Sequence, residues 1–202
     1  MSRPYESPTR KAQAEETKRK ILLALVDLLV EERPATISIP QVARRAEVSV
    51  RIVYHYFPTK EALCDGLTEA MDSILTLPDG ERPPSPSSPA ELVAAMPAIY
   101  RFFAANRRLF RALAVSEFGE RAAPSRAADR YERVDRALAP LRERLAPDEY
   151  QRLRGAVGIF VTSDGFEALT TTWGLSDEEA SDVAGWTVRT LCERARRSGV
   201  QA

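Results

Sequence analysis

Apolar residues recur at helical spacing through almost the whole chain. In residues 14–32 they stand at positions 21, 22, 25, 28 and 29, which predicts one amphipathic helix. The same spacing predicts further helices near 39–46, 50–56, 59–76, 90–105, 106–118, 124–145, 147–173 and 177–198. No stretch alternates with the period of a strand, and we find no internal repeat. We therefore expect an all-α protein of about nine helices.

One segment departs from this pattern. Residues 78–89 contain five prolines and cannot form a helix or a central strand, so we expect an exposed, semi-rigid connection there. Arg33-Pro34 is expected to end the first long helix. Pro97 and Pro140 fall inside two predicted helices and should kink or split them.

Residues 38–57 have the pattern of two short helices joined by a turn. Ser38 and Ser49 each precede a helical stretch and can cap it, and Pro40 is tolerated in a first turn. The residues expected to face inward are Val42, Ala43, Ala46, Val48, Ile52, Val53 and Phe57. This arrangement is a helix-turn-helix, in which the second helix can enter the major groove of DNA.

The outward face of the second helix carries groups suited to DNA. Arg51 can read a guanine edge or hold a phosphate, and Val50 could touch a thymine methyl group. Tyr54 and His55 suit phosphate oxygens, as does Lys60 just beyond the helix. The alternative is a pair of packed core helices with no role in DNA binding.

Charge is distributed unevenly along the chain. The 29 basic and 29 acidic residues cancel overall, but residues 1–60 hold eleven basic and seven acidic residues, a net charge of +4. The remainder is correspondingly acidic, and all lysines lie within the first sixty residues. A basic head on an acidic body favours a polyanionic partner for the head. An uneven surface charge without functional meaning is the alternative.

A longer motif spans both short helices and the start of the next: Val42-Ala43-x-x-Ala46-x-Val48-Ser49-x-x-x-Val53-Tyr54-x-Tyr56-Phe57-Pro58-x-Lys60-x-x-Leu63. It closely resembles the DNA-binding signature of TetR-type transcriptional regulators. The resemblance implies a three-helix DNA-binding domain, residues 1–60, and a helical effector-binding and dimerisation domain, residues 61–202. It also implies a homodimer on a palindromic operator that represses until a small molecule binds.

The resemblance assigns DNA-facing positions residue by residue. They are Ser38, Ser49, Val50, Arg51, Ile52, Tyr54, His55, Tyr56 and Lys60. Two residues depart from the family pattern. Glu47 stands at a turn position where glycine is common and must adopt the backbone conformation that the turn demands. Arg51 stands where small residues are common, so the operator sequence cannot be taken from relatives.

The helical body offers candidates for an effector site. An effector cavity needs an apolar lining with a few polar groups. The candidates are Met96, Tyr100, Phe103, Phe110, Phe160 and Asp164. Aromatic residues at helical spacing also build an ordinary core, which is the alternative interpretation.

Small residues mark a candidate dimer interface, which the resemblance places on the last two helices. Gly158, Thr162, Gly165 and Leu169 share a face of the predicted helix 147–173. The last helix adds Val183, Thr187 and Leu191. Together they are compatible with a four-helix seam between two copies. Packing within one chain is the alternative.

Catalysis, metal binding and membrane insertion are not indicated. The sole histidine lies in the DNA-binding motif, and no GxSxG, P-loop or GxGxxG motif occurs. Two distant cysteines do not suggest a zinc site or disulfides, and no signal peptide or bilayer-spanning run is evident. We expect a cytoplasmic, non-enzymatic regulator without cofactor or metal. The alternatives are a DNA-bound activator without effector, and a helical small-molecule-binding or enzymatic protein that does not bind DNA.

Overall fold

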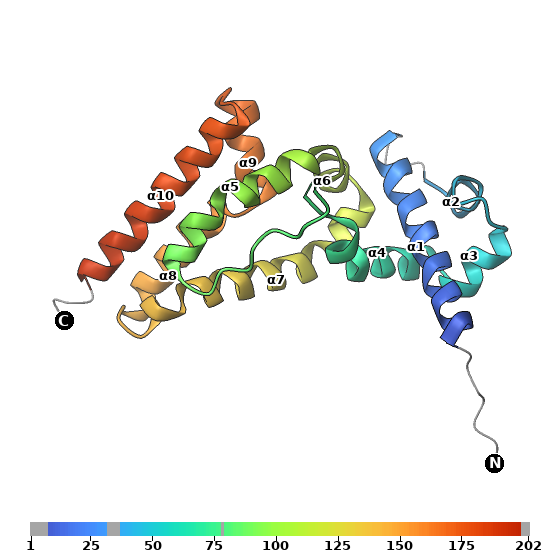
Figure 1. The fold of residues 1–202 in the computed structure, drawn as a ribbon, viewed down its shortest axis with the longest axis horizontal. Helices are drawn as coiled ribbons and strands as arrows, with labels where there is room; N and C mark the ends of the chain where they lie inside the picture. Colours follow the sequence, from blue (N-terminus) through green and yellow to red (C-terminus); the bar gives the residue numbers. More distant parts are fainter. Residues whose placement is uncertain (1–7, 32–36, 78, 199–202) are drawn as a thin grey trace, which may run out of the picture. The chain divides into compact units, whose positions relative to one another are not determined.

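The computed structural model describes residues 8–31, 37–77 and 79–198, and every regular element in them is helical (Figure 1). The helices are α1 Pro8–Glu31, α2 Ile39–Arg45, α3 Val50–Tyr56, α4 Lys60–Ile74, α5 Pro89–Ala105, α6 Arg107–Ala114, α7 Glu117–Arg142, α8 Pro147–Phe160, α9 Ser163–Glu167, the π-helix Ala168–Thr172 and α10 Asp177–Ser198. The all-α prediction is confirmed. The predicted helix stop at Arg33-Pro34 lies outside the described residues.

The chain divides into two compact units. Unit 1 comprises Met1–Ile74 and Arg108–Ala123, and unit 2 comprises Leu75–Arg107 and Pro124–Ala202. The expected functional boundary at residue 60 stays a prediction, because compactness does not say which residues bind DNA.

Unit 1 is organised around the long helix α1. Ile21, Leu25 and Leu29 of α1 are almost completely buried, and so are Val42 of α2 and Val53 of α3. Apolar residues three and four apart place one face of α1 against α2 and α4, as Figure 1 shows. Sequence reasoning placed α2 and α3 correctly to within one residue.

Unit 2 is built on the close packing of α5 and α10, which lie side by side in Figure 1. On α10 the buried positions Ala180, Ala184 and Val188 recur every four residues. Small side chains at this spacing let the two helices approach closely, and the buried Met96 of α5 lies beside Gly185 of α10. The Tyr100 hydroxyl donates a hydrogen bond to the Phe160 carbonyl at 3.0 Å.

The predicted helices 106–118 and 124–145 have the wrong boundary. The break falls earlier, between the end of α6 at Ala114 and the start of α7 at Glu117. The buried Ser116 hydroxyl accepts a hydrogen bond from the Gly119 amide at 3.1 Å, so it caps α7. A β-carbon on Gly119 would lie 1.7 Å from the Leu113 carbonyl oxygen, so only glycine fits this junction.

The predicted single helix 147–173 is also wrong. It ends at Phe160, and α9 and the π-helix follow as separate segments. The Thr162 hydroxyl accepts a hydrogen bond from the Gly165 amide at 3.0 Å and donates one to the Ile159 carbonyl at 2.8 Å. Thr162 therefore caps a new helix, because its side chain competes for backbone groups that a continuous helix would use.

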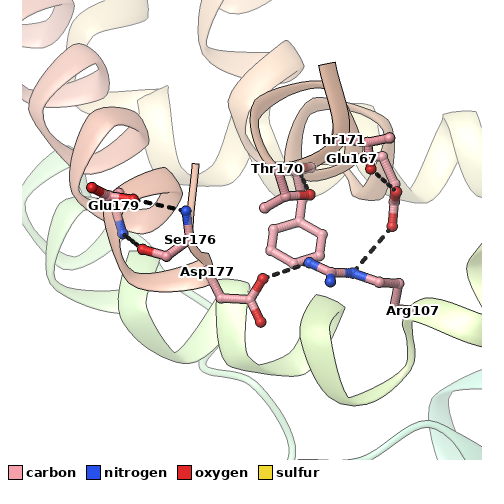
Figure 2. Close-up of polar contacts among 8 residues, drawn as sticks. Arg107, Glu167, Thr170, Thr171, Ser176, Asp177 and Glu179 are labelled. Atoms are coloured by element: carbon pink, nitrogen blue, oxygen red, sulfur yellow. Dashed lines mark hydrogen bonds and ion pairs between the residues drawn. The ribbon is translucent and has the colours of Figure 1, made fainter. Parts of the chain in front are cut away.

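Arg107 connects the α5–α6 junction to the segments that follow this break (Figure 2). Its guanidinium bonds Asp177 at the start of α10 at 2.5 Å and lies 3.4 Å from Glu167 of α9. It also lies over the Phe166 ring, 4.6 Å from the ring centroid. Ser176 and Glu179 form a capping box that fixes the start of α10.

The prolines within helices do not split them. Pro97 lies inside α5, and Pro124 and Pro140 lie inside α7. All three residues are exposed, so water can bond the carbonyl groups that lose their amide donor. Pro97 and Pro140 therefore do not split their helices, and the expected kinks stay a prediction.

Candidate nucleic-acid interface

The helix α3 has one buried and one exposed face. Val53 is fully buried and Phe57, its C-cap, is 6% exposed. On the other side Val50 and Ile52 are each 39% exposed and Tyr54 is 48% exposed. The expectation that Ile52 helps to anchor the helix is wrong, because Val53 and Phe57 suffice. The exposed apolar groups are available to a partner.

Side chains at both helix starts fix the motif. The Ser49 hydroxyl accepts a hydrogen bond from the Ile52 amide at 3.3 Å and so caps α3. At α2 the backbone amide and the hydroxyl of Ser38 both donate to Oε1 of Gln41, each at 2.7 Å. Ser38 is thus tied to the first turn through Gln41. Local hydrogen bonds of this kind set the helix boundaries independently of any partner.

The turn between α2 and α3 depends on Glu47. Its φ is +53°, in the left-handed region, and it is the sole non-glycine residue with positive φ among those described. The Val48 amide then bonds the Ala43 carbonyl at 3.0 Å and closes the turn. The Glu47 carboxylate pairs with Lys20 of α1 at 3.1 Å. Position 47 therefore holds a residue with a β-carbon in a conformation that favours glycine.

The remaining DNA-facing candidates on α3 are accessible. Arg51 and His55 are exposed and Tyr56 is half-buried. The rings of His55 and Tyr56 meet edge to face with centroids 5.0 Å apart. These side chains are close enough in sequence to follow a single groove, which is what a recognition helix requires.

Lys60, at the start of α4, already has a partner within unit 1. Its ammonium pairs with the Glu117 carboxylate and lies 5.4 Å from the centroid of the buried Phe118 ring. One turn further along each helix, Arg121 pairs with Asp65 at 3.0 Å. The first turns of α7 are therefore held against α4 by two ion pairs and an aromatic ring.

Unit 2 contains an open pocket of about 550 Å³ between α7, α8 and α9. It is lined by Arg130, Tyr131, Val134, Gln151, Arg154, Gly155, Gly158, Ile159, Thr162, Asp164, Gly165 and Ala168. This volume lies in the range of small-molecule sites. The arginines and Tyr131 escaped the sequence analysis because charged and aromatic residues at helical spacing usually form an ordinary helix surface. The sequence offered one signal for these residues: Arg126, Arg130 and Val134 recur every four residues and so share one face of a helix.

The expected effector residues do not assemble around this pocket. Asp164 lines it, but Met96, Tyr100 and Phe103 are buried core residues of α5. The Tyr100 and Phe103 rings pack on Phe166 with centroids 5.4 and 6.0 Å away. The structure therefore places these aromatic residues in the core, as the alternative interpretation had it.

The other two effector candidates also lie elsewhere. Phe110 belongs to unit 1, whereas the pocket belongs to unit 2. Phe160 is half-buried, and its carbonyl accepts the Tyr100 hydrogen bond. Neither residue lines the pocket. A role for any of these residues in effector binding stays a prediction.

The candidate dimer residues are divided between different environments. Gly158 and Thr162 line the pocket, Gly165 is buried and Leu169 is half-buried. They do not form one helical face, because the helix breaks at Val161. On α10, Val183 is exposed, and Thr187 and Leu191 are half-buried. Their role in a dimer stays a prediction.

Sequence reasoning missed three exposed apolar side chains of unit 2. Trp173 is 76%, Trp186 66% and Ile159 61% exposed. Trp186 stands three residues after Val183 on α10, a spacing that could have identified it.

Two further expectations concern metals and membranes. The described residues hold no group of three or more His, Cys, Asp or Glu side chains that could bind a metal ion. In the same part of the chain, each helix is too short or too polar to cross a bilayer.

Comparison with known proteins places the helix-turn-helix in a family. Residues 21–67 match the family described as "Bacterial regulatory proteins, tetR family". The fold is similar to the crystal structure of NalD from Pseudomonas aeruginosa, the secondary repressor of the MexAB-OprM multidrug efflux pump, with a TM-score of 0.58 and 20% identity. The similarity covers 92% of this chain and 96% of that one. No curated protein matches the chain.

Proposed function

We propose that this chain, a TetR-family DNA-binding transcriptional regulator, acts in the bacterial cytoplasm as a ligand-responsive repressor that binds a palindromic operator as a homodimer. Regulators of this family are not enzymes, so the match of residues 21–67 supports the non-enzymatic interpretation. The observation that carries the proposal is the two-faced α3. Its inner face is buried in unit 1, and its outer face exposes Val50, Arg51 and Tyr54.

The proposed DNA contacts fall into two groups. Arg51, Val50 and Ile52 are exposed on α3 and would approach base edges in the major groove. The other candidates carry hydroxyl, imidazole or ammonium groups that suit phosphates, and they are Ser38, Ser49, Tyr54, His55, Tyr56 and Lys60. Phosphate contacts fix the position of α3 on the duplex, and base contacts select the sequence.

A second copy of the chain is the proposed partner of the exposed apolar residues on α10. Val183 and Trp186, three residues apart, are exposed on this helix, which the family resemblance places in the dimer interface. Neighbouring exposed large apolar side chains mark protein interfaces. A two-fold dimer would place two α3 helices on two half-sites about 34–36 Å apart.

Effector binding is proposed to act through α7. Residues 117–123 of α7 belong to unit 1, and Glu117 holds Lys60 there. Later residues of the same helix, Arg130 and Val134, line the pocket of unit 2. A ligand that prefers the DNA-incompetent state would shift the protein toward that state and release the operator.

A gel-shift titration with the DNA flanking the protein's own gene tests the proposal. The wild-type protein should bind this DNA in preference to a scrambled duplex, and affinity should fall steeply with salt. The Arg51→Ala/Tyr54→Ala variant should lose specific binding. Arg189→Ala, an exposed arginine of α10, serves as the control and should bind like wild type. Absence of specific binding by the wild type at low salt would refute the regulator function.

A further inference from the structure

We propose that the pocket between α7, α8 and α9 binds an amphipathic carboxylate, with Arg130 as the residue that receives the carboxylate group. The inference rests on the proposed function, because it names the chemical class of its effector. It is carried by the charges and the open space at the pocket, which both point to the same kind of ligand.

Arg130 is a half-buried cation in the pocket lining. Its guanidinium makes no hydrogen bond or ion pair with any residue that the structure describes. Arg126 stands one turn earlier on α7, where burial and then the charge of Arg130 lower its pKa. Like charges four residues apart on a helix repel each other. An anion at this end of the pocket would relieve the repulsion.

The carboxylates near the pocket are not paired with Arg130. Asp135 is committed to Arg154, which it meets at 2.8 and 2.9 Å, and to the Tyr150 hydroxyl at 2.7 Å. Asp164 lines the pocket, and its charge acts on Arg126. Among the described residues, neither carboxylate forms an ion pair with Arg130. A charged ligand at this position is better matched if it is negative.

Other residues of the pocket lining are suited to an apolar body. Val134 and Ile159 contribute aliphatic side chains, and the Tyr131 ring is fixed by Arg154, whose guanidinium lies 4.6 Å from its centroid. On α8, added β-carbons at Gly155 and Gly158 would meet nothing within 4 Å. These two glycines keep the space open. The combination of one anchoring cation and an open apolar wall is typical of sites for amphipathic ligands.

Calorimetric titration with matched probes tests the ligand class. Decanoate and 1-naphthoate carry the carboxylate, whereas decanamide and 1-naphthamide keep the same apolar bodies without charge. We expect at least one carboxylate to bind about ten- to hundredfold more tightly than its amide, the range expected of a charge-assisted contact. Equal affinity of both pairs, stronger binding of an amide, or no binding of either carboxylate would overturn the inference.

Three variants locate the site. Arg130→Gln should abolish the preference for the carboxylate but leave amide binding unchanged. Arg133→Gln, which alters an exposed arginine of the same helix outside the pocket lining, should behave like wild type. Gly158→Leu should block both probes, because an added β-carbon there enters open space of the pocket. Circular dichroism checks that each variant is folded. A preference that survives Arg130→Gln would also contradict the assignment.

The same samples separate this inference from the regulator function. Probe binding is measured without DNA, and operator binding is measured by gel shift without probe. Carboxylate binding with no operator binding would leave the site intact and refute the regulator. If the protein binds its operator and only neutral or cationic compounds release it, the regulator function would stand and the proposed carboxylate ligand would be refuted.

Discussion

The ammonium of Lys60 is paired with the carboxylate of Glu117, so a proposed phosphate contact is occupied when no DNA is present. The two residues lie 57 positions apart, and both belong to unit 1. Operator DNA must therefore displace a carboxylate before Lys60 can bind a phosphate. This pair makes Glu117 a competitor of DNA for the same cation.

Glu117→Gln should strengthen DNA binding. The amide cannot hold the ammonium as the carboxylate does, so Lys60 becomes available to phosphate. Because both side chains are partly exposed, the pair is worth about 0.2–1 kcal/mol and the gain should be at most about fivefold. Gel-shift titrations at low salt measure it. The control Glu120→Gln alters an exposed glutamate of the same helix and should leave affinity unchanged, whereas weaker binding by Glu117→Gln would contradict the competition.

Glu47→Gly should be more stable than Glu47→Ala. Glu47 has a φ of +53°, where a β-carbon is disfavoured and glycine is not. Relative to Glu47→Ala, which also removes the carboxylate but keeps the β-carbon, we expect a gain of about 1 kcal/mol in the free energy of unfolding. Urea denaturation compares the two variants. Equal stability would show that the turn tolerates the β-carbon without cost.

Arg51→Ala should change which operator is preferred. Arg51 is exposed on α3, where an arginine can make two hydrogen bonds to one guanine. If Arg51 makes such a contact, its loss lowers the binding preference for that base pair by about 1–3 kcal/mol. Loss of a phosphate contact instead lowers the affinity for all DNA sequences by the same factor. Binding selections from random DNA with wild type and variant distinguish the two. Unchanged base preference at every position would make Arg51 a phosphate contact.

Gly165→Ala should destabilise the protein, although Gly158→Ala should not. A β-carbon at Gly165 would lie 2.1 Å from the Ile159 carbonyl oxygen, so the break between α8 and α9 would have to shift. Overpacking of this kind costs about 1–3 kcal/mol. At Gly158 nothing lies within 4 Å, and alanine in a helix gains up to about 1 kcal/mol. Urea denaturation measures both, and equal effects would contradict the close contact.

These glycines show how far the sequence allowed the fold to be predicted. The helices α2 and α3 were predictable because serines at 38 and 49 and the apolar spacing between them all indicate the same boundaries. The break after Phe160 was not predictable, because Thr162 and Gly165 continue a helical pattern of small residues. It depends on Thr162 bonding two backbone groups, which is visible only in three dimensions.

The candidate site was predictable in part for a similar reason. The exposed face of α3 follows from helical periodicity within seven residues. The pocket instead requires that α7, α8 and α9 come together, so that Arg130 and Ile159 face one space. Periodicity within one helix does not say which neighbour covers its face. The aromatic residues of α5 were consequently expected at the effector site, whereas they pack with Phe166 in the core.

Stability should fall as the pH rises from about 9 to about 11, because two buried thiols resist ionisation. Burial, followed by the charge of Glu117, raises the pKa of Cys64 from an ordinary 9.0 to about 11. Burial likewise raises the pKa of Cys192 from 9.0 to about 11. Above the ordinary value the unfolded chain releases protons that the folded chain retains, so the equilibrium shifts toward unfolding.

Urea denaturation at pH 8.5 and 10.5 measures this dependence. The Cys64→Ala/Cys192→Ala variant lacks both thiols, so its loss of stability between the two pH values should be smaller than that of wild type. Its absolute stability is not the readout, because each substitution also leaves a small void. Thiol reagents provide an independent check, since a buried thiol of high pKa should react with them only on unfolding. Identical slopes in wild type and variant, together with rapid labelling of the folded protein, would contradict the burial of both thiols.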